Sequence, residues 1–517
     1  MSKWWTLVAV CLATLMLLLD VTIVNVALPA IERDLHASFS DLQWVVDAYS
    51  LTLAAALLTA GSVGDLIGRR RVFVAGLGLF AFASLLCGLA TTPLFLNLSR
   101  GLQGIGASMM FATSLALLAG AYQGRDRGTA IGIWGATIGA AVAIGPLVGG
   151  VLTEGIGWEA IFFVNVPIGL AVIALTLRTV AKSDLGEGKV DLPGVVTFSA
   201  ALFLLVFSLI RGNDVGWGSG QIVGMLVAAA VLMGLFLVVE RRSRHPMLDL
   251  SLFRKPAFVG ASLTAFVLSA SMFSMFLYLT LYIQNQLEYS PLQAGLRFLP
   301  TTLLSFFVAP VAGKLSEKLG VRWFVGAGLL CVGVGLLLMS GLSASSEWTA
   351  LLPGFTLTGI GVGMTNPALA TAAVGVVEPR FAGMASGINS TFRQVGIATG
   401  VAAWGAIFQS VVNDRAGQFA TALGGQVPKG RAGEFSDFIS FGAYHRLGAR
   451  ADGPGRDAFL HGLDSILIAA GVLAIVGAIL CCVLLRPKDF VAHGVQDPAP
   501  APEPGGRRGT GPEPAVA

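Results

Sequence analysis

The sequence predicts an all-α membrane protein that crosses the bilayer many times. Hydrophobic residues make up 55% of its 517 residues and charged residues only 12%, about half the charged share of ordinary soluble domains. Apolar runs of about 20 residues, the length that spans a bilayer, follow one another along the chain. A loop sequence that occurs twice predicts two related halves. This composition excludes a soluble or a disordered protein, and the small net charge of +4 does not indicate a nucleic-acid partner.

The apolar runs, separated by charged or Gly/Pro-rich breaks, predict about fourteen membrane-spanning helices. Their ranges are 5–28, 43–62, 72–91, 94–118, 129–153, 160–180, 193–211, 220–240, 257–283, 294–313, 322–343, 349–375, 386–411 and 462–485. Lys and Arg gather in alternate short loops, and this bias predicts that both termini are cytoplasmic. The N-terminal run is too long for a secretory signal, so we expect it to remain as the first helix.

Cysteine and histidine usage does not indicate a metal site. The five cysteines lie within apolar runs, and the five histidines lie outside these runs or at their edges. Their spacings fit neither a disulfide framework nor a zinc site. The sequence also lacks the Gly-rich loop with Lys-Ser/Thr that binds ATP phosphates. We therefore expect no metal and no cofactor, and a proton gradient as the energy source.

One loop motif occurs twice. Residues 61–70 (GSVGDLIGRR) and 313–322 (GKLSEKLGVR) share glycine, acid, glycine and arginine at the same offsets. Each follows the second helix of a six-helix group if residues 193–240 are set aside as two inserted helices. The predicted organisation is a six-helix bundle at 1–180, the inserted pair at 193–240, a second six-helix bundle at 257–485 with an outer loop at 412–461, and a disordered cytoplasmic tail at 486–517. Two such halves place a substrate path at their interface.

Several motifs carry a family resemblance. They are residues 19–29 (LDVTIVNVALP), 61–71 (GSVGDLIGRRR), 100–106 (RGLQGIG) and 135–150, which ends in GPLVGG. Residues 158–169 (WEAIFFVNVPIG) also fit, except that relatives usually carry Arg where this chain has Glu159. Together these segments resemble the major facilitator superfamily, specifically its fourteen-helix drug:proton antiporters, the EmrB/QacA-like group.

The resemblance implies the major facilitator fold and a multi-pass transporter of the bacterial plasma (inner) membrane rather than an enzyme. It implies multidrug efflux, in which antibiotics, drugs or other amphipathic small molecules are exported in exchange for protons by alternating access. We expect a monomer whose partners are such molecules, protons and the lipid bilayer. One alternative is an exporter dedicated to an endogenous metabolite, lipid or siderophore. A different class would be a membrane-embedded enzyme or a non-transporting sensor.

Asp20 is the most informative residue, because a carboxylate within a membrane helix needs a partner, a proton or water. It lies about 13 Å along its helix from Pro29, and Arg100 lies about 10 Å from Pro93, so the two charges share a depth. We interpret them as a proton-coupling pair. Burial disfavours an ionised carboxylate and a nearby arginine favours it, so a rocking motion can switch its proton affinity. The alternative is a fixed structural ion pair.

Polar and aromatic residues within the predicted spans supply candidates for a substrate cavity. These candidates are Asn25, Gln103, Met272, Phe276, Arg393 and Gln394. Arg393 would either polarise the cavity or tether neighbouring carbonyls. Met272 and Phe276 belong to a Met- and Phe-rich stretch that suits amphipathic compounds and would equally suit lipid. Asp47 is interpreted as a solvated residue near a helix end.

The first copy of the repeated loop is predicted to act as a cytoplasmic latch. Its residues are Gly61, Asp65, Gly68, Arg69 and Arg70. Asp65 can accept hydrogen bonds from Arg69 or from a helix N-terminus, although these arginines would also occur as positive-inside charge alone. The fifth helix is predicted to pack closely on its neighbours through small residues, and its association with antiport comes from the resemblance. Its motif residues are Gly135, Gly139, Gly145, Pro146, Gly149 and Gly150.

Overall fold

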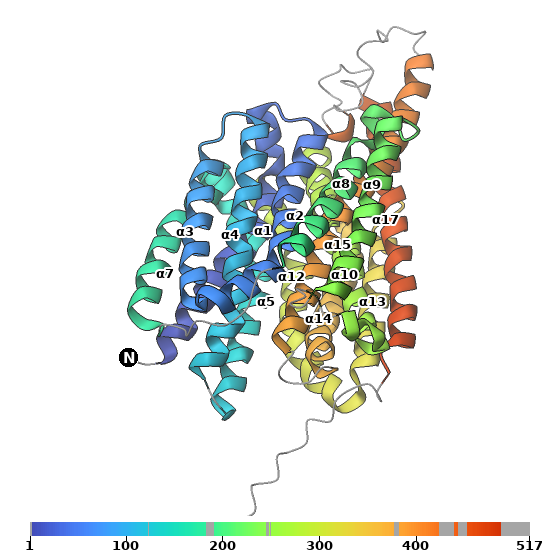
Figure 1. Ribbon diagram of the computed structural model, residues 1–517. Coiled ribbons are helices and arrows are strands. Elements are labelled where there is room, and N and C mark those ends of the chain that lie inside the picture. The colour runs from blue at the N-terminus through green and yellow to red at the C-terminus, as the bar shows by residue number, and fades with distance from the viewer. Residues whose placement is uncertain are drawn as a thin grey trace, which may run out of the picture.

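The computed structural model describes residues 3–122, 124–181, 191–243, 248, 250–376, 382–422, 439–442 and 452–486. Within these ranges the chain consists of helices and connections, with no strand. Fourteen long helices result when α6 and α7 are counted as one interrupted helix and the segment from α10 to η3 as another. Figure 1 shows them standing side by side as a bundle. The predicted all-α, fourteen-helix fold class is therefore confirmed.

The N-terminal half contains seven helical segments. They are α1 (Lys3–Leu35), α2 (Phe39–Ile67), α3 (Arg69–Gly88), α4 (Pro93–Ala121), α5 (Gly124–Gly155), α6 (Ala160–Phe163) and α7 (Asn165–Thr179). Within this half, α4 packs against α2 and α3, α1 packs against α5, and α7 packs against α3 and α1. The helices α1, α2, α3, α4 and α7 therefore enclose a common interior.

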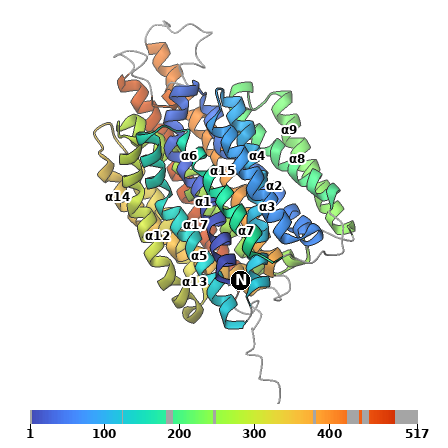
Figure 2. The same ribbon diagram turned by 90° about the vertical axis from the view of Figure 1, so that its left-hand side faces the viewer.

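The inserted pair consists of α8 (Leu192–Val215) and α9 (Gly220–Arg242). The two pack on each other, and α8 also contacts α2 and α15. Figure 2 shows both at the edge of the molecule. Their apolar side chains are largely exposed there, among them Val196, Phe203, Val227 and Val231. Exposed apolar side chains on helices of this length are what a lipid environment requires.

The C-terminal half follows. Its segments are η1 (Leu250–Arg254), α10 (Pro256–Leu268), η2 (Ser269–Phe273), α11 (Met275–Leu281), η3 (Tyr282–Gln286), α12 (Pro291–Leu319), α13 (Val321–Leu338), η4 (Trp348–Leu351), α14 (Leu352–Gly375), α15 (Ala382–Ala422) and α17 (Asp452–Leu484). Both η2 and η3 are π-helical, so the helix that begins at Pro256 widens twice before it ends. The most extensive packing within this half is that of α14 on α13 and α12 and of α17 on α13, and α15 packs on α17 and α10.

Several helix boundaries in the structure differ from those predicted from the sequence. The second helix is Phe39–Ile67 rather than 43–62, and the thirteenth runs through Ala382–Ala422 rather than 386–411. The last helix begins at Asp452, so the predicted loop at 412–461 is helical at both ends. The sixth span is interrupted at Val164, where α6 ends and α7 begins. Of the described helices, eleven are long and apolar enough to cross a membrane by length and composition.

Helix starts are specified by local sequence. Ser38 precedes α2 and forms a capping box with Asp41, in which each side chain bonds the other residue's backbone N–H. Ser290 and Gln293 form the same box at the start of α12. Thr92 caps α4, with Pro93 in the first turn. These three starts lie at one end of the bundle, here named the Ser38 end, and the opposite end is named the Arg69 end (Figure 1).

The two copies of the repeated loop have the same backbone geometry. Gly68 joins α2 to α3 with φ 99°, and Gly320 joins α12 to α13 with φ 95°. Each glycine N–H closes the preceding helix by donating to the carbonyl four residues earlier, on Gly64 and Ser316 respectively. Positive φ favours glycine because a Cβ would clash in this region. The internal repeat read from the sequence is therefore also a repeat of structure.

The two halves meet closely at the Ser38 end. Gln43 Nε2 on α2 donates to the Val401 carbonyl on α15 over 3.1 Å, and Gln284 Nε2 on η3 donates to the Val26 carbonyl on α1 over 2.7 Å. Glu154 at the end of α5 accepts hydrogen bonds from Ser290 Oγ at 2.5 Å and from the Leu292 N–H at 3.1 Å. These bonds join helices of the first half to helices of the second.

Aromatic packing reinforces this contact. The Phe39 ring of α2 lies 5.6 Å from the Phe408 ring, 6.0 Å from Phe441 and 6.2 Å from Tyr278. At the Arg69 end, Lys3 pairs with Asp126 within the first half, and Lys255 Nζ donates to the Val376 carbonyl within the second. The structure therefore shows the halves closed against each other at the Ser38 end.

Candidate functional site

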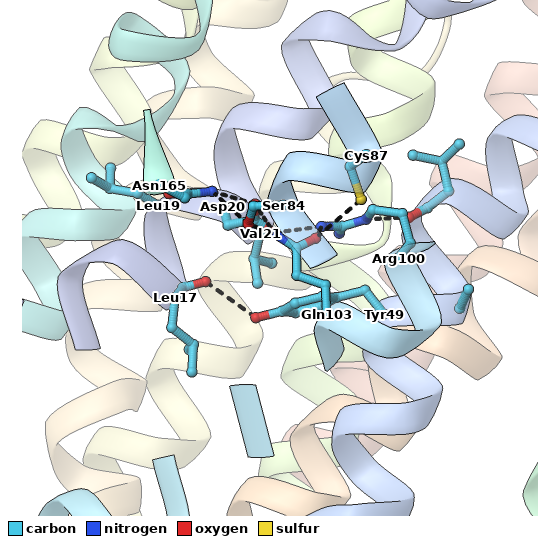
Figure 3. Close-up of polar contacts among 12 residues, drawn as sticks. Leu17, Leu19, Asp20, Val21, Tyr49, Ser84, Cys87, Arg100, Gln103 and Asn165 are labelled. Carbon is cyan, nitrogen blue, oxygen red and sulfur yellow. Dashed lines mark hydrogen bonds and ion pairs between the residues drawn. The ribbon is translucent and has the colours of Figure 1, made fainter. Parts of the chain in front are cut away.

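Asp20 and Arg100 form an ion pair inside the N-terminal half. Arg100 Nη1 on α4 lies 2.5 Å from Asp20 Oδ2 on α1, and the two side chains are 2% and 1% exposed. Figure 3 shows the pair at the centre of a cluster of polar side chains. The shared depth inferred from Pro29 and Pro93 therefore corresponds to a direct contact.

The second carboxylate oxygen of Asp20 is also satisfied. Gln103 Nε2 donates to Asp20 Oδ1 at 2.8 Å, and Asn165 Nδ2 of α7 donates to the same atom at 3.1 Å. Both amides also donate to Ser84 Oγ of α3, at 2.7 Å and 3.5 Å. Three helices, α3, α4 and α7, thus supply side chains around one carboxylate of α1, and each of these side chains is buried. The donors favour its ionised form.

Arg100 is held by further contacts that connect it to α2. Its Nε donates to the Val45 carbonyl at 2.9 Å, and its guanidinium lies 4.3 Å from the centre of the Tyr49 ring. Its Nη1 also donates to Gln103 Oε1 at 2.6 Å. The Tyr49 hydroxyl in turn donates to the Leu17 carbonyl of α1 at 3.3 Å. A planar guanidinium can make all these contacts at once, whereas a lysine ammonium cannot.

This arrangement has a defined chemical capability. Separating a buried ion pair leaves an uncompensated charge, which costs about 3 to 5 kcal/mol. A proton on Asp20 removes the part of that cost that is due to the carboxylate, while Arg100 keeps its contacts with Val45, Gln103 and the Tyr49 ring. Protonation of Asp20 and movement of α4 or α2 relative to α1 are therefore energetically linked.

The motif glycines of the fifth helix allow close approach on two sides. Gly145 lies against Thr22 of α1, and a Cβ at Gly149 would lie 2.9 Å from the Ile23 carbonyl oxygen. A Cβ at Gly150 would lie 2.6 Å from Leu292 Cα on α12, in the other half. Pro146 lies within α5. Gly135 and Gly139 lie on the same helix, and their surroundings are outside the described part of the chain.

The predicted latch residues lie at the junction of α2 and α3. Gly68 supplies the positive φ, Arg69 Nη1 donates to the Ala116 carbonyl at 3.4 Å, and Arg70 Nη2 donates to the Leu177 carbonyl at 2.6 Å. Gly61 faces Ala112 of α4. The Asp65 side chain, central to the predicted latch, lies outside the described residues. The arginines therefore tie this junction to α4 and α7.

The remaining cavity candidates do not all lie together. Gln103 belongs to the Asp20 cluster, whereas Asn25 Nδ2 donates to its own helix, at the Val21 carbonyl. Met272 and Phe276 are 1% and 7% exposed, so these two side chains pack inside the protein rather than against lipid. Phe276 stacks near Phe298, with ring centres 5.2 Å apart.

Arg393 and Gln394 are neighbours on α15. Arg393 Nη2 donates to Asn366 Oδ1 of α14 at 3.1 Å, so the side chain joins two helices of the second half. Gln394 is 8% exposed, and its Oε1 has no hydrogen-bond partner among the described residues. Arg393 thus contacts a side-chain amide.

The interpretation of Asp47 as a solvated residue is wrong. Its side chain is 0% exposed, and neither carboxylate oxygen has a hydrogen-bond partner among the described residues. The reason is that α15 of the second half covers this part of α2. Nearness to a helix end along the sequence does not indicate water access when another helix packs over that end.

Sequence reasoning did not single out Tyr49, Ser84 and Asn165. Ser84 is a small polar residue inside an apolar run, and Tyr49 lies in an ordinary stretch of α2. Asn165 was visible as part of the segment WEAIFFVNVPIG, but nothing in that segment indicates that it contacts Asp20. A search for polar residues at the depth of Asp20 on each neighbouring helix could have found Ser84 and Asn165.

The fold and the site together define a class of protein. A membrane-embedded bundle of two repeated halves, with a buried ion pair on the helices of one half, is the architecture of a transporter that works by alternating access. A sequence profile described as "Major Facilitator Superfamily" matches residues 10–401 of this chain. The chain therefore belongs to the Major Facilitator Superfamily and is a multi-pass protein of the bacterial inner membrane.

Relatives of this chain include named resistance proteins. The chain is 39% identical to the multidrug resistance protein Stp of Mycobacterium tuberculosis (strain CDC 1551 / Oshkosh) over 404 residues, which cover 78% of this chain and 75% of Stp. It is 34% identical to the tetracenomycin C resistance and export protein of Streptomyces glaucescens over 488 residues, which cover 92% and 90% of the two chains.

A solved structure shares the fold. It is a bacterial homologue of the human lysosomal transporter Spinster in an inward-facing and unoccupied conformation. The two structures have a TM-score of 0.65 and 18% sequence identity, and the match covers 95% of this chain and 99% of the other.

Proposed function

We propose that this protein is a proton-coupled antiporter that exports drugs, antibiotics or other amphipathic small molecules across the bacterial inner membrane. The buried pair of Asp20 and Arg100 carries this proposal, since it is a proton-binding group linked to helix packing. The names of two relatives, Stp and the tetracenomycin C export protein, support the proposed substrate class and the proposed direction of transport, out of the cell. The proton gradient is the energy source, and the working unit is a monomer.

The mechanism follows from the Asp20 cluster. In the conformation closed at the Ser38 end, Asp20 is ionised and holds Arg100, Gln103 and Asn165. With the termini in the cytoplasm, as the charge bias predicts, this conformation opens toward the cytoplasm and is the one that receives substrate. After export, a proton from the outside neutralises Asp20, releases Arg100 and permits the return. The proton leaves on the cytoplasmic side when the ion pair forms again.

Movement reaches the interface between the halves through α2. Arg100 binds the backbone of α2 at Val45, and α2 contacts α15 of the second half. A change in the Arg100 contacts therefore acts on the helix that opens and closes the path. One charge moving through 100 mV supplies about 2.3 kcal/mol, which is enough for a substrate gradient of several tens-fold.

Transport into proteoliposomes tests this function. Purified protein is reconstituted, a pH gradient is imposed, and accumulation of ethidium or a tetracycline-type antibiotic is followed. We expect accumulation that needs the gradient and stops with a protonophore. The Asp20→Asn variant should bind substrate and exchange it down its own gradient, yet fail to concentrate it. Accumulation by Asp20→Asn equal to that of the wild type would contradict the role of Asp20.

A dedicated exporter is the second candidate. The relative matched over 92% of this chain is named for resistance to and export of one compound, tetracenomycin C. A panel of chemically varied compounds distinguishes the candidates, because a multidrug exporter lowers the accumulation of many classes in cells that express it. A dedicated exporter protects against one scaffold only.

A further inference from the structure

Asp47 is a carboxyl group buried at the contact between the two halves. It is the ninth residue of α2, about 12 Å along the helix from Phe39. Gln43, one turn earlier, bonds Val401 of α15, and Leu51, one turn later, packs with Ala398 and Ala402 of α15. Residues four apart share a helix face, so Asp47 lies on the face that α15 covers.

Among the described residues, none near Asp47 provides a positive charge to balance an ionised carboxylate. Tyr278 of α11 lies near enough to interact with it electrostatically, and the Tyr278 hydroxyl donates to the Val401 carbonyl at 2.6 Å, beside the Gln43 amide. Both potential donors are thus directed to Val401 rather than to Asp47, whose two oxygens have no described partner.

Away from the terminal turns, the described charged groups on the elements that pack around α2 are engaged elsewhere. On α1 and α4 these are Asp20 and Arg100, which bind each other. On α8, Arg211 lies against the Phe207 ring. On α15, Arg393 binds Asn366 of α14. On α2 itself, Asp41 caps the helix start with Ser38.

Burial then decides the protonation state of Asp47. An unpaired carboxylate in a dry interior is so unfavourable that the group takes up a proton instead. The interface of α2 and α15 is dry only while the Ser38 end is closed. When the halves separate there, water reaches the carboxyl and stabilises its ionised form.

We propose that Asp47 is a second proton-binding site, which takes up one proton as the Ser38 end closes and releases it as that end opens. The site deepens the proposed function, because it rests on the two halves opening and closing in turn. Uptake and release occur on the same side of the membrane, so this proton adds nothing to the stoichiometry of exchange. It makes closing depend on the proton concentration at the Ser38 end.

A distance measurement tests the site directly. Spin labels are placed at Thr91 in the first half and Ala344 in the second, both exposed and in connections at the Ser38 end, in a transport-competent variant whose five native cysteines are replaced by alanine. The ratio of closed to open populations is recorded against pH in the wild type, Asp47→Asn, Asp20→Asn and the control Glu347→Gln. Glu347 is an exposed acid at the same end.

Closing binds a proton at Asp47 and releases one at Asp20, so the two effects oppose each other in the wild type. In Asp20→Asn only the Asp47 proton remains, and raising the pH should therefore open the Ser38 end of this variant. One coupled proton changes the population ratio by up to tenfold per pH unit, or about 1.4 kcal/mol. Asp47→Asn keeps the shape and lacks the charge, so we expect it to remain closed at high pH. Asp20→Asn should retain the change in the closed-to-open ratio with pH that is due to Asp47. Glu347→Gln should show the same pH dependence as the wild type.

Two kinds of result would overturn the proposal. One is an Asp20→Asn protein whose Ser38 end does not open as the pH rises, or an Asp47→Asn protein whose pH dependence equals that of the wild type. The other is an infrared difference spectrum between wild type and Asp47→Asn, at neutral pH, that lacks a protonated carboxyl band in the closed wild type. The infrared measurement needs no labels and applies even if a labelled variant folds poorly. Failure of gradient-driven transport with normal pH-dependent closing would instead contradict the proposed function alone.

Discussion

Arg100 on α4 donates from Nε to the backbone carbonyl of Val45 on α2, over 2.9 Å. The same guanidinium binds Asp20 on α1. A residue that holds a carboxylate on one helix and a main-chain oxygen on another links protonation to backbone position. Val45 lies between Gln43 and Asp47, which face the second half. The site for the proton and the contact between the halves are therefore two residues apart on α2.

The guanidinium shape of Arg100 should matter as much as its charge. Arg100→Lys keeps the charge but cannot bind Asp20, Val45 and Gln103 together. Loss of one charged hydrogen bond, worth about 1.5 to 3 kcal/mol, should slow gradient-driven transport about tenfold or more. Initial rates in proteoliposomes measure this, with the exposed Arg242→Lys as control. Equal transport rates for Arg100→Lys and the wild type would exclude a role for the planar guanidinium and its several simultaneous hydrogen bonds.

Asn165 should tune the pH dependence of transport. Asn165→Ala removes one donor to Asp20 Oδ1, which favours protonation of the carboxylate. The acid limb of the pH–rate profile should shift toward higher pH, because the ionised carboxylate has lost a hydrogen-bond donor. The profile is recorded at saturating substrate. A shift toward lower pH, or none, would contradict the view that this amide stabilises the ionised form.

Gly150 should set how closely the halves approach at the Ser38 end. A Cβ at this position would lie 2.6 Å from Leu292 Cα, whereas Gly155 on the same helix has nothing within 4 Å. Gly150→Ala should therefore open the Ser38 end, and Gly155→Ala should leave it closed. Distances between labels at Thr91 and Ala344 distinguish the two outcomes. Identical distance distributions for both variants would mean that α12 shifts to accommodate the methyl group.

The paired junction glycines should contribute equally to stability. Gly68→Ala and Gly320→Ala each place a side chain at φ near 95° to 99°, which costs about 1 to 2 kcal/mol. Each should lower the unfolding midpoint in detergent by about 1 to 2 °C. Gly218→Ala, with open space around it and no positive φ, serves as control. If only one of the two substitutions lowered the unfolding midpoint, the repeated loops would differ in their structural role.

The sequence predicted most of the fold because bilayer-spanning helices are long and apolar, and each leaves a signal of its own. The repeat at residues 61–70 and 313–322 predicted the two halves, and both glycines adopt the same φ. Asp20 and Arg100 were found because charges are rare in such helices and depth can be counted along the chain. A contact between them then needed only that α1 and α4 be neighbours.

The features that the sequence did not predict depend on packing between helices that are distant in sequence. That α15 covers Asp47 could not be predicted from the sequence, because a carboxylate near a helix end is usually solvated. Ser84 and Asn165 are ordinary polar residues until α3 and α7 bring them to Asp20. The π-helical turns at Ser269–Phe273 and Tyr282–Gln286 also lack a periodic signature in the sequence.

Substrate-induced proton release from the purified protein tests the central claim most directly. Protein in weakly buffered detergent solution is mixed with substrate while a pH indicator is followed. Substrate favours the conformation closed at the Ser38 end, in which Asp20 is ionised, so molecules that were open at that end with Asp20 protonated should lose this proton. The account predicts that Asp47→Asn, which lacks the uptake at residue 47, releases protons on binding, that the wild type releases fewer, and that Asp20→Asn, which binds substrate, releases none. Equal release from the wild type and Asp20→Asn would contradict the assignment of Asp20 as the coupling carboxylate.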